Sequence, residues 1–231
     1  MTSVIDYTEL FLTAVVYTIA LSVMSIIGGT LVGVVFGFLS ARRLEAPHWF
    51  RAARVFIDIY VRIFRSVPPL VLMFLLYFGV SAAMNLSISM TAAVVLALTL
   101  FVGAYQSENI RAGVESVPRG QAEASAALGL GIFSRMRYVE ARPTFAVALP
   151  SMVGQWVVTI KDTSLASGIG VVEATTIALT VRQATGETWL VFLVLGVTYF
   201  LINRGVALLG SVLEKRISRS TSRAQSRAAL V

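Results

Sequence analysis

Five long apolar segments constrain this chain more than any other feature of its sequence. We place them near residues 10–39, 67–83, 89–110, 144–160 and 188–212. A helix needs about 20 apolar residues to cross roughly 30 Å of hydrocarbon. Only 13% of the 231 residues are charged, against about 25% in a soluble domain. The sequence therefore predicts an all-α polytopic membrane protein with about five transmembrane helices, built as a single domain over residues 1–216.

The first apolar segment is predicted to be a retained span. No Lys or Arg precedes Arg42, so the basic start of a signal peptide is missing, and the run is far longer than a signal sequence needs. The segment is rich in small residues, among them Gly28, Gly29, Gly33 and Gly37. Small residues let membrane helices approach closely, so we expect this span to pack tightly against another.

Lys and Arg alternate between the loops in a pattern that predicts orientation. They gather in the loop after the first span (Arg42, Arg43, Arg51, Arg54), in the loop at 111–143, and in the tail. Cytoplasmic loops carry the basic excess, so the N-terminus is expected outside and the C-terminus in the cytoplasm. Arg62 and Arg65 end an amphipathic stretch before the second span and are interpreted as cytoplasmic anchors. Residues 217–231 are predicted to be a disordered cytoplasmic tail near anionic lipid.

Several kinds of chemistry find no support in the sequence. There is no phosphate-binding Gly-rich loop ending in Lys and Ser or Thr, and there is no cysteine. The single histidine, His48, lies in a basic loop and is interpreted as an interfacial side chain. We expect no catalytic residue, no metal site and no cofactor within this chain, and hence no enzyme.

The loop between the third and fourth spans, residues 114–143, is long for a connection, which usually takes about 4–6 residues. Ser-Val-Pro118 should end the preceding helix. The Ala-rich stretch that follows favours a short helix, and Gly129 supplies a left-handed cap. An interfacial helix is the simpler alternative, but the face is too small and Ala-rich for strong lipid binding. A docking element for a soluble partner fits better.

Four motifs in order resemble the permease subunits of polar amino acid ABC importers, the histidine/glutamine permease family. They are Tyr60-Val-Arg-Ile-Phe-Arg65-Ser-Val-Pro68; Gly103-Ala-Tyr105-Gln-Ser-Glu108-Asn-Ile-Arg111-Ala-Gly113; Glu123-Ala124-Ser125 with Gly129 six residues after Glu123; and Lys161-Asp162-Thr163-Ser164-Leu165 with Ile169-Gly170-Val-Val-Glu173. The similarity covers residues 10 to 216, nearly the whole chain. One departure is that Ala141-Arg142 stand where the family usually has Leu-Pro, with Pro143 one position later.

The resemblance implies a type I ABC importer permease fold in a bacterial inner membrane. It implies four kinds of partner: a cytoplasmic ATPase dimer that carries the ATP and Mg, a second permease subunit (a copy or a paralogue), a periplasmic solute-binding protein and the lipid bilayer. No nucleic acid is expected. The helix at 120–129 would couple to the ATPase through Gly120, Glu123, Ala124, Ser125, Ala127, Leu128 and Gly129. The implied solute is a polar amino acid or a related compound such as an opine.

Charged and hydroxyl residues near the ends of two spans are candidates for the substrate pathway, because charge inside a membrane is costly and usually functional. One pair is Glu108 and Arg111, three residues apart on one helical face. The other group adjoins a helix break and contains Lys161, Asp162, Thr163 and Ser164. Each group has a purely structural alternative, an ion pair that fixes the helix or its break.

Two other classes of protein stay open at this point. A membrane scaffold could dock a soluble partner through the same loop without transporting anything. A secondary transporter or channel is disfavoured, because the sequence contains no internal repeat and no carboxylate in mid-span.

Overall fold

The computed structural model describes residues 4–41 and 48–228, and within these residues the regular structure is helical throughout. Arg42, Arg43 and the rest of the expected basic loop at 42–47 lie outside the described residues. The elements are α1 (Val4–Ser40), α2 (His48–Ser66), α3 (Pro69–Phe74), η1 (Leu75–Val80), α4 (Ser81–Met84), α5 (Met90–Ser116), α6 (Arg119–Ala127), α7 (Ile132–Arg135), η2 (Met136–Glu140), α8 (Ala141–Asp162), η3 (Thr163–Ile169), α9 (Ala174–Thr185) and α10 (Thr188–Ala228).

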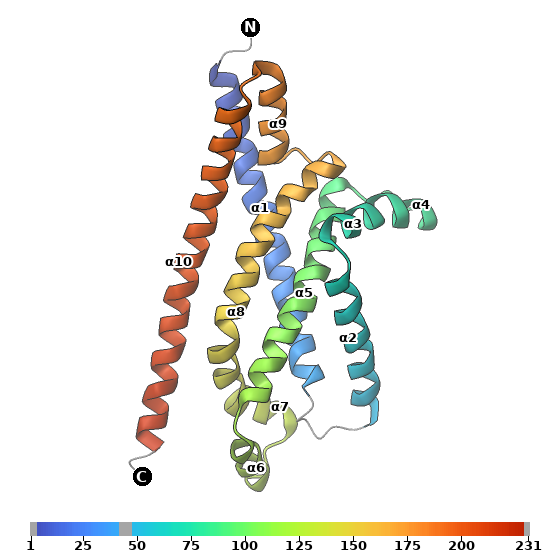
Figure 1. Ribbon diagram of the computed structural model, residues 1–231. Helices are drawn as coiled ribbons and strands as arrows, with labels where there is room; N and C mark the ends of the chain where they lie inside the picture. Colours follow the sequence, from blue (N-terminus) through green and yellow to red (C-terminus); the bar gives the residue numbers. More distant parts are fainter. Residues whose placement is uncertain (1–3, 42–47, 229–231) are drawn as a thin grey trace.

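The long helices form an up-and-down bundle. Figure 1 shows α1, α5 and α10 running from the upper to the lower end, with α2 and α8 running back. The N- and C-termini lie at opposite ends of the bundle (Figure 1). By length and composition, four helices in the described part can cross a membrane, and a bent pair of helices makes up to five. The all-α polytopic fold with about five spans is therefore confirmed.

The second span differs from the straight segment expected at 67–83. Instead, the helical segments Arg51–Ser66 and Pro69–Met84 meet at a bend of 107°. In Figure 1, α2 runs along the bundle while α3, η1 and α4 project sideways from its upper end. Pro68 and Pro69 stand at the bend, and proline cannot donate the backbone hydrogen bond that would continue the helix. The amphipathic stretch is thus one arm of a bent pair whose two helices pass the test for a membrane span only when taken together.

The close approach expected for the first span is made with α5. A Cβ placed on Gly33 would lie 2.3 Å from the Cβ of Gln106, and one placed on Gly29 would lie 2.5 Å from the Cβ of Val102. Gly37 meets Ile110 in the same way. Because these glycines recur every four residues, they form one stripe along α1. We call this contact the α1–α5 seam.

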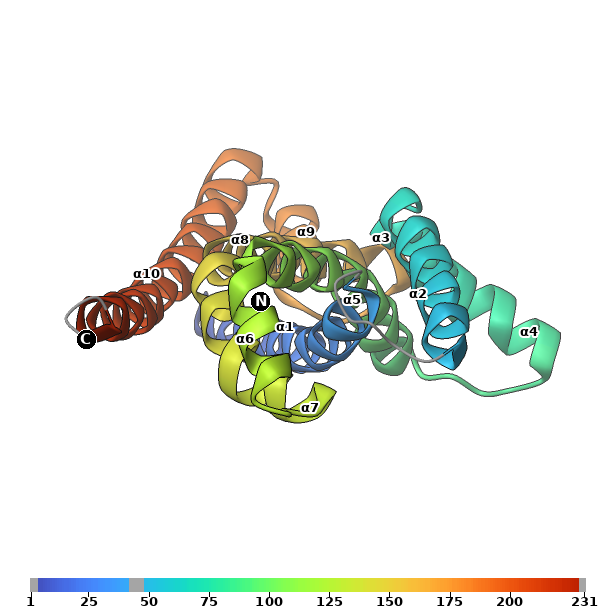
Figure 2. The same cartoon turned by 90° about the horizontal axis from the view of Figure 1, so that it is seen from below.

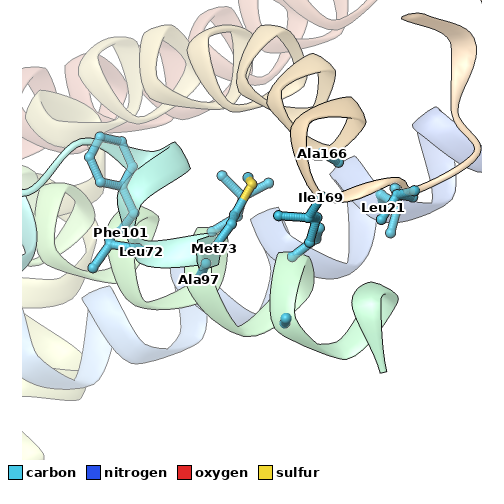
Figure 3. Packing of buried hydrophobic residues seen from close by; sticks show 11 residues of the cluster. Leu21, Leu72, Met73, Ala97, Phe101, Ala166 and Ile169 are labelled. Atoms are coloured by element: carbon cyan, nitrogen blue, oxygen red, sulfur yellow. The ribbon is translucent and has the colours of Figure 1, made fainter. Parts of the chain in front are cut away.

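A second packing centre lies at the upper end of the bundle. Figure 3 shows side chains from α1, α3, α5 and η3 meeting there. Leu21, Met73 and Ala97 are fully buried in this cluster. Seen from below, α10 and the α3–α4 arm lie on opposite sides of the central helices (Figure 2). The centre of the bundle is therefore α1, α5 and α8, and the other long elements are peripheral.

The last helix is longer than expected. A disordered tail was expected over 217–231, whereas the backbone of α10 continues to Ala228. Residues 211–228 contain no Gly or Pro, the two residues that most strongly break a helix. The side chains beyond Ile217 lie outside the described residues.

Candidate functional site

The expected docking helix is α6, at the lower end of the bundle where α10 also ends (Figure 1). It begins directly after Pro118, and α5 before it ends at Ser116 with Val117 extended. The Ser-Val-Pro stop is therefore confirmed. α6 lies on the same end as the start of α2 and the C-terminal half of α10, where the basic residues of the sequence gather.

Gly129 closes α6 in the left-handed conformation, with a φ of 72°. The Leu130 N–H donates to the Ser125 carbonyl at 3.0 Å, and the Gly129 N–H donates to the Ala126 carbonyl at 2.9 Å. These two bonds satisfy carbonyls at the helix end, as in a Schellman cap. A Cβ on Gly129 would have open space around it, so backbone conformation alone favours glycine there.

The residues expected to couple to a partner are mostly exposed. Six of the seven are on the surface, namely Gly120, Glu123, Ala124, Ala127, Leu128 and Gly129, and Ser125 is buried. Ser125 donates its hydroxyl to the Ala122 carbonyl at 2.7 Å. Large apolar side chains stand exposed beside them, with Leu128 at 79% and Phe133 at 73%. A helix with an exposed acid and a rim of apolar side chains is suited to bind a protein groove.

The return path from α6 to α8 passes through a π-helix, η2, which ends at Glu140. Glu140 is buried, and its Oε1 lies 3.1 Å from the Nε of Arg135 in an ion pair. The Ala141-Arg142 departure follows directly, and α8 begins at Ala141 without a break in the helix. The sequence does not indicate this pair, since residues five apart meet on one face only where the helix is π-like.

Glu108 and Arg111 form the ion pair that their spacing predicts, with Arg111 Nη2 donating to Glu108 Oε2 at 2.7 Å. Arg65 of α2 joins them, 3.7 Å from the same oxygen. Its guanidinium also stacks over the ring of Tyr105 at 4.9 Å. Arg65 and Arg62 stand near the bend of α2, at its far end from α6. Their expected role as cytoplasmic anchors stays a prediction.

The second group of candidates lies where α8 gives way to the 3-10 helix η3. Lys161 is exposed and Asp162 is half-buried. The Thr163 hydroxyl donates to the Ile160 carbonyl at 2.7 Å, and the Ser164 hydroxyl donates to the Lys161 carbonyl at 2.7 Å. Both hydroxyl protons are thus used to satisfy the end of α8, and only their lone pairs are left to meet a solute.

The two candidate groups lie apart along the bundle. Ala166 and Ile169 of η3 pack in the same cluster as Ala97 of α5. Glu108 stands three turns further along α5 than Ala97, roughly 16 Å at 1.5 Å per residue. Any pathway that uses both groups must therefore contain two successive sites.

Glu173, whose role the sequence left open, is fully buried at the upper end of the bundle. It caps α9 by accepting the Thr176 N–H at Oε1, 3.0 Å away. Its Oε2 accepts the Tyr199 hydroxyl at 3.1 Å and the Thr18 hydroxyl at 3.4 Å. Burial raises the pKa of this carboxyl, and the hydrogen bonds from Thr175, Thr176 and Tyr199 oppose that rise. Glu173 therefore ties α1, α9 and α10 together.

No group of three or more His, Cys, Asp or Glu residues that could hold a metal ion occurs among the residues that the structure describes.

Comparison with known proteins gives a consistent result. Residues 33–219 match the family described as binding-protein-dependent transport system inner membrane component. The arginine ABC transporter permease protein ArtQ of Haemophilus influenzae is 30% identical over 172 residues, covering 72% of this chain and 74% of the relative. The nopaline transport system permease protein NocM of Agrobacterium fabrum is 40% identical over 152 residues, covering 62% and 63%.

Longer and structural matches agree. The glutamate/aspartate import permease protein GltJ of Escherichia coli is 30% identical over 212 residues, covering 87% of this chain and 84% of the relative. A chain in the crystal structure of an amino acid ABC transporter with histidines superposes with a TM-score of 0.79 at 26% identity, covering 94% of this chain and all of that one.

Proposed function

The chain belongs to the family of binding-protein-dependent transport system inner membrane components, the permease subunits of ABC importers, and we propose that it imports a polar amino acid or a related compound such as an opine. The solute class rests on relatives that are permeases for arginine, glutamate and aspartate, and nopaline. The chain is a multi-pass membrane protein and not an enzyme. ATP hydrolysis belongs to a separate subunit.

The observation that carries the proposal is the capped helix α6, which stands exposed at one end of a membrane bundle. Its Glu123 is exposed, and its last turn is closed by the two backbone hydrogen bonds of the Gly129 cap. Such a helix can enter a groove of a cytoplasmic ATPase without rearranging the bundle. Closure of the ATPases on ATP would then shift the bundle between outward-open and inward-open states.

The remaining partners follow from the same proposal. A second permease subunit, either a copy of this chain or a paralogue, completes the pathway, and a periplasmic solute-binding protein delivers the solute. The bundle sits in a bacterial inner membrane with its N-terminus outside and with α6 and the C-terminus in the cytoplasm. The basic residues beside α6 favour this orientation.

We further propose that the pathway passes both candidate groups. Glu108 and Arg111 form one binding site, and Lys161, Asp162 and the lone pairs of Thr163 and Ser164 form the other. A zwitterionic solute offers one carboxylate and one ammonium, so it suits sites that each contain an acidic and a basic side chain. Unchanged transport kinetics in Asp162→Asn would exclude Asp162 from the pathway.

Uptake by the whole system tests the function. Cells carrying the permease, its ATPase and its binding protein should take up a labelled member of a panel of arginine, glutamate, histidine, cystine and nopaline. Glu123→Lys and Gly129→Asp should each abolish that uptake at normal membrane levels and release the ATPase during purification. Retention of an ATPase with no uptake of any panel member would instead favour a scaffold, and normal uptake by both variants would exclude α6 as the coupling helix.

A further inference from the structure

Helix α2 carries a stripe of charged side chains, of which only Arg65 takes part in the ion pairs described above. Asp58, Arg62 and Arg65 are spaced four and three residues apart, so they lie on one face. Ile57 and Tyr60 are buried, and the Tyr60 hydroxyl donates to the Leu100 carbonyl of α5 at 2.6 Å. This contact fixes α2 against α5, and with it the direction in which the charged stripe points.

The stripe faces a cavity between α2 and α5. The cavity measures about 510 Å³ and is lined by the charged residues Asp58, Arg62, Arg65, Glu108 and Arg111, together with Tyr105. Small-molecule sites generally measure about 300–1,000 Å³. We call this space the α2–α5 pocket. Its size suits an amino acid or a slightly larger compound.

The charges in the α2–α5 pocket do not balance one another. Arg65 and Arg111 converge on the same oxygen of Glu108, at 3.7 and 2.7 Å. Within the described part of the chain, no carboxylate lies within ion-pair distance of Arg62. Three guanidinium groups against two carboxylates leave one formal positive charge. Arg62 and Arg65 are exposed where they line this pocket, so their guanidinium groups are open to an anionic group from outside the chain.

Guanidinium groups bind carboxylates through their positive charge and their N–H donors, and a lysine ammonium offers the same charge. We propose that the α2–α5 pocket binds the carboxylate of the transported solute, with Arg62 and Arg65 as its donors and Asp58 facing the solute's ammonium. This inference rests on the proposed function and adds Asp58, Arg62 and Arg65 to the pathway. Asp58 favours a zwitterion over a lipid phosphate, because a carboxylate repels the second anion and attracts an ammonium.

The test compares Arg62→Gln, Arg62→Lys and Arg51→Gln in proteoliposomes that contain permease, ATPase and binding protein. Arg51 belongs to the same helix but does not line the pocket. With the panel member that the wild type transports, Arg62→Gln should lower the maximal uptake rate at least tenfold. Arg62→Lys should keep the rate within about threefold, and Arg51→Gln within twofold. ATP hydrolysis stimulated by the binding protein should stay within about threefold in all variants.

The outcomes separate this inference from the function it rests on. If the wild type transports no panel member, the proposed function fails, whatever Arg62 does. If the wild type transports and Arg62→Gln matches it, the pocket is not a carboxylate site. If Arg62→Gln and Arg62→Lys lower the maximal uptake rate equally, the positive charge of Arg62 is not what the pocket uses, and the proposal is overturned. A defect that disappears in vesicles of phosphatidylcholine alone would assign the pocket to an anionic lipid headgroup.

Discussion

Two buried glutamates lie at opposite ends of the bundle, and the chain stabilises them in different ways. Glu140, at the α6 end, is balanced by the charge of Arg135 five residues earlier. Glu173, at the other end, is held by neutral donors, the Thr18 and Tyr199 hydroxyls and the Thr176 N–H. The first arrangement comes from one short segment and the second from three distant ones.

The two glutamates therefore stabilise different parts of the molecule. The Arg135–Glu140 pair fixes the return path of the coupling loop onto α8 and involves no other long helix. Glu173 and its donors join α1, α9 and α10 at the upper end of the bundle (Figure 1). A substitution of Glu140 should therefore destabilise the α6 end of the bundle. A substitution of Glu173 should instead weaken the packing of α10 against α1 and α9.

The largest expected effect comes from Glu140→Gln. The substitution leaves the buried Arg135 guanidinium without its counter-charge, and breaking one half of a buried ion pair costs about 3 kcal/mol or more. Unfolding of the purified protein in detergent by sodium dodecyl sulfate, followed by circular dichroism, should show this loss of unfolding free energy.

The control for that variant removes both charges. Arg135→Met combined with Glu140→Leu should return most of the lost stability, because apolar side chains of similar volume replace buried pairs at little cost. If the double variant is as unstable as Glu140→Gln, the pair does not act through its charge.

A smaller loss is expected from Tyr199→Phe at the opposite end. The substitution removes one donor from the buried Glu173 carboxyl, and hydrogen bonds to charged groups contribute about 1.5–3 kcal/mol. The same detergent titration measures it. Tyr138→Phe provides the matched control, because Tyr138 is 74% exposed and should show no change. Equal stability of both variants would remove Tyr199 from the Glu173 cluster.

Much of this comparison could not have been read from the sequence. The spans, the Ser-Val-Pro118 stop and the Gly129 cap depend on local patterns, and the structure confirms them. Glu173 depends on contacts with residues 155 and 26 positions away, Thr18 and Tyr199, which no local pattern encodes. The bend in the second span was missed because a proline pair at a helix start and one at a break look alike in sequence.

A loss near 1 kcal/mol is expected from Gly129→Ala, because alanine is disfavoured in the left-handed region by about 1–2 kcal/mol. Gly131→Ala is the matched control, since Gly131 has a φ of −64° and open space around it. Limited proteolysis of the 114–143 loop should accelerate in the first variant only. Similar cleavage of both would show that the cap does not hold the end of α6.

The smallest effect is expected from pH. Because burial raises the pKa of Glu173 above its ordinary value, the folded protein binds more protons than the unfolded chain within that window. The free energy of unfolding should therefore fall as the pH rises from the ordinary to the raised pKa, and level off above it. In Glu173→Gln this part of the pH dependence should vanish. An unchanged pH profile in Glu173→Gln would assign the dependence to another group.

The 107° bend between α2 and α3 has a mechanical consequence. A straight helix is stiff along its axis and passes a push from one end to the other. A rod broken at nearly a right angle converts such a push into leverage about the break. A displacement along α2 would therefore arrive at Pro68 and Pro69 across the axis of α3, and it would press on the cluster in which Leu72 and Met73 are buried instead of sliding α3 along its own axis.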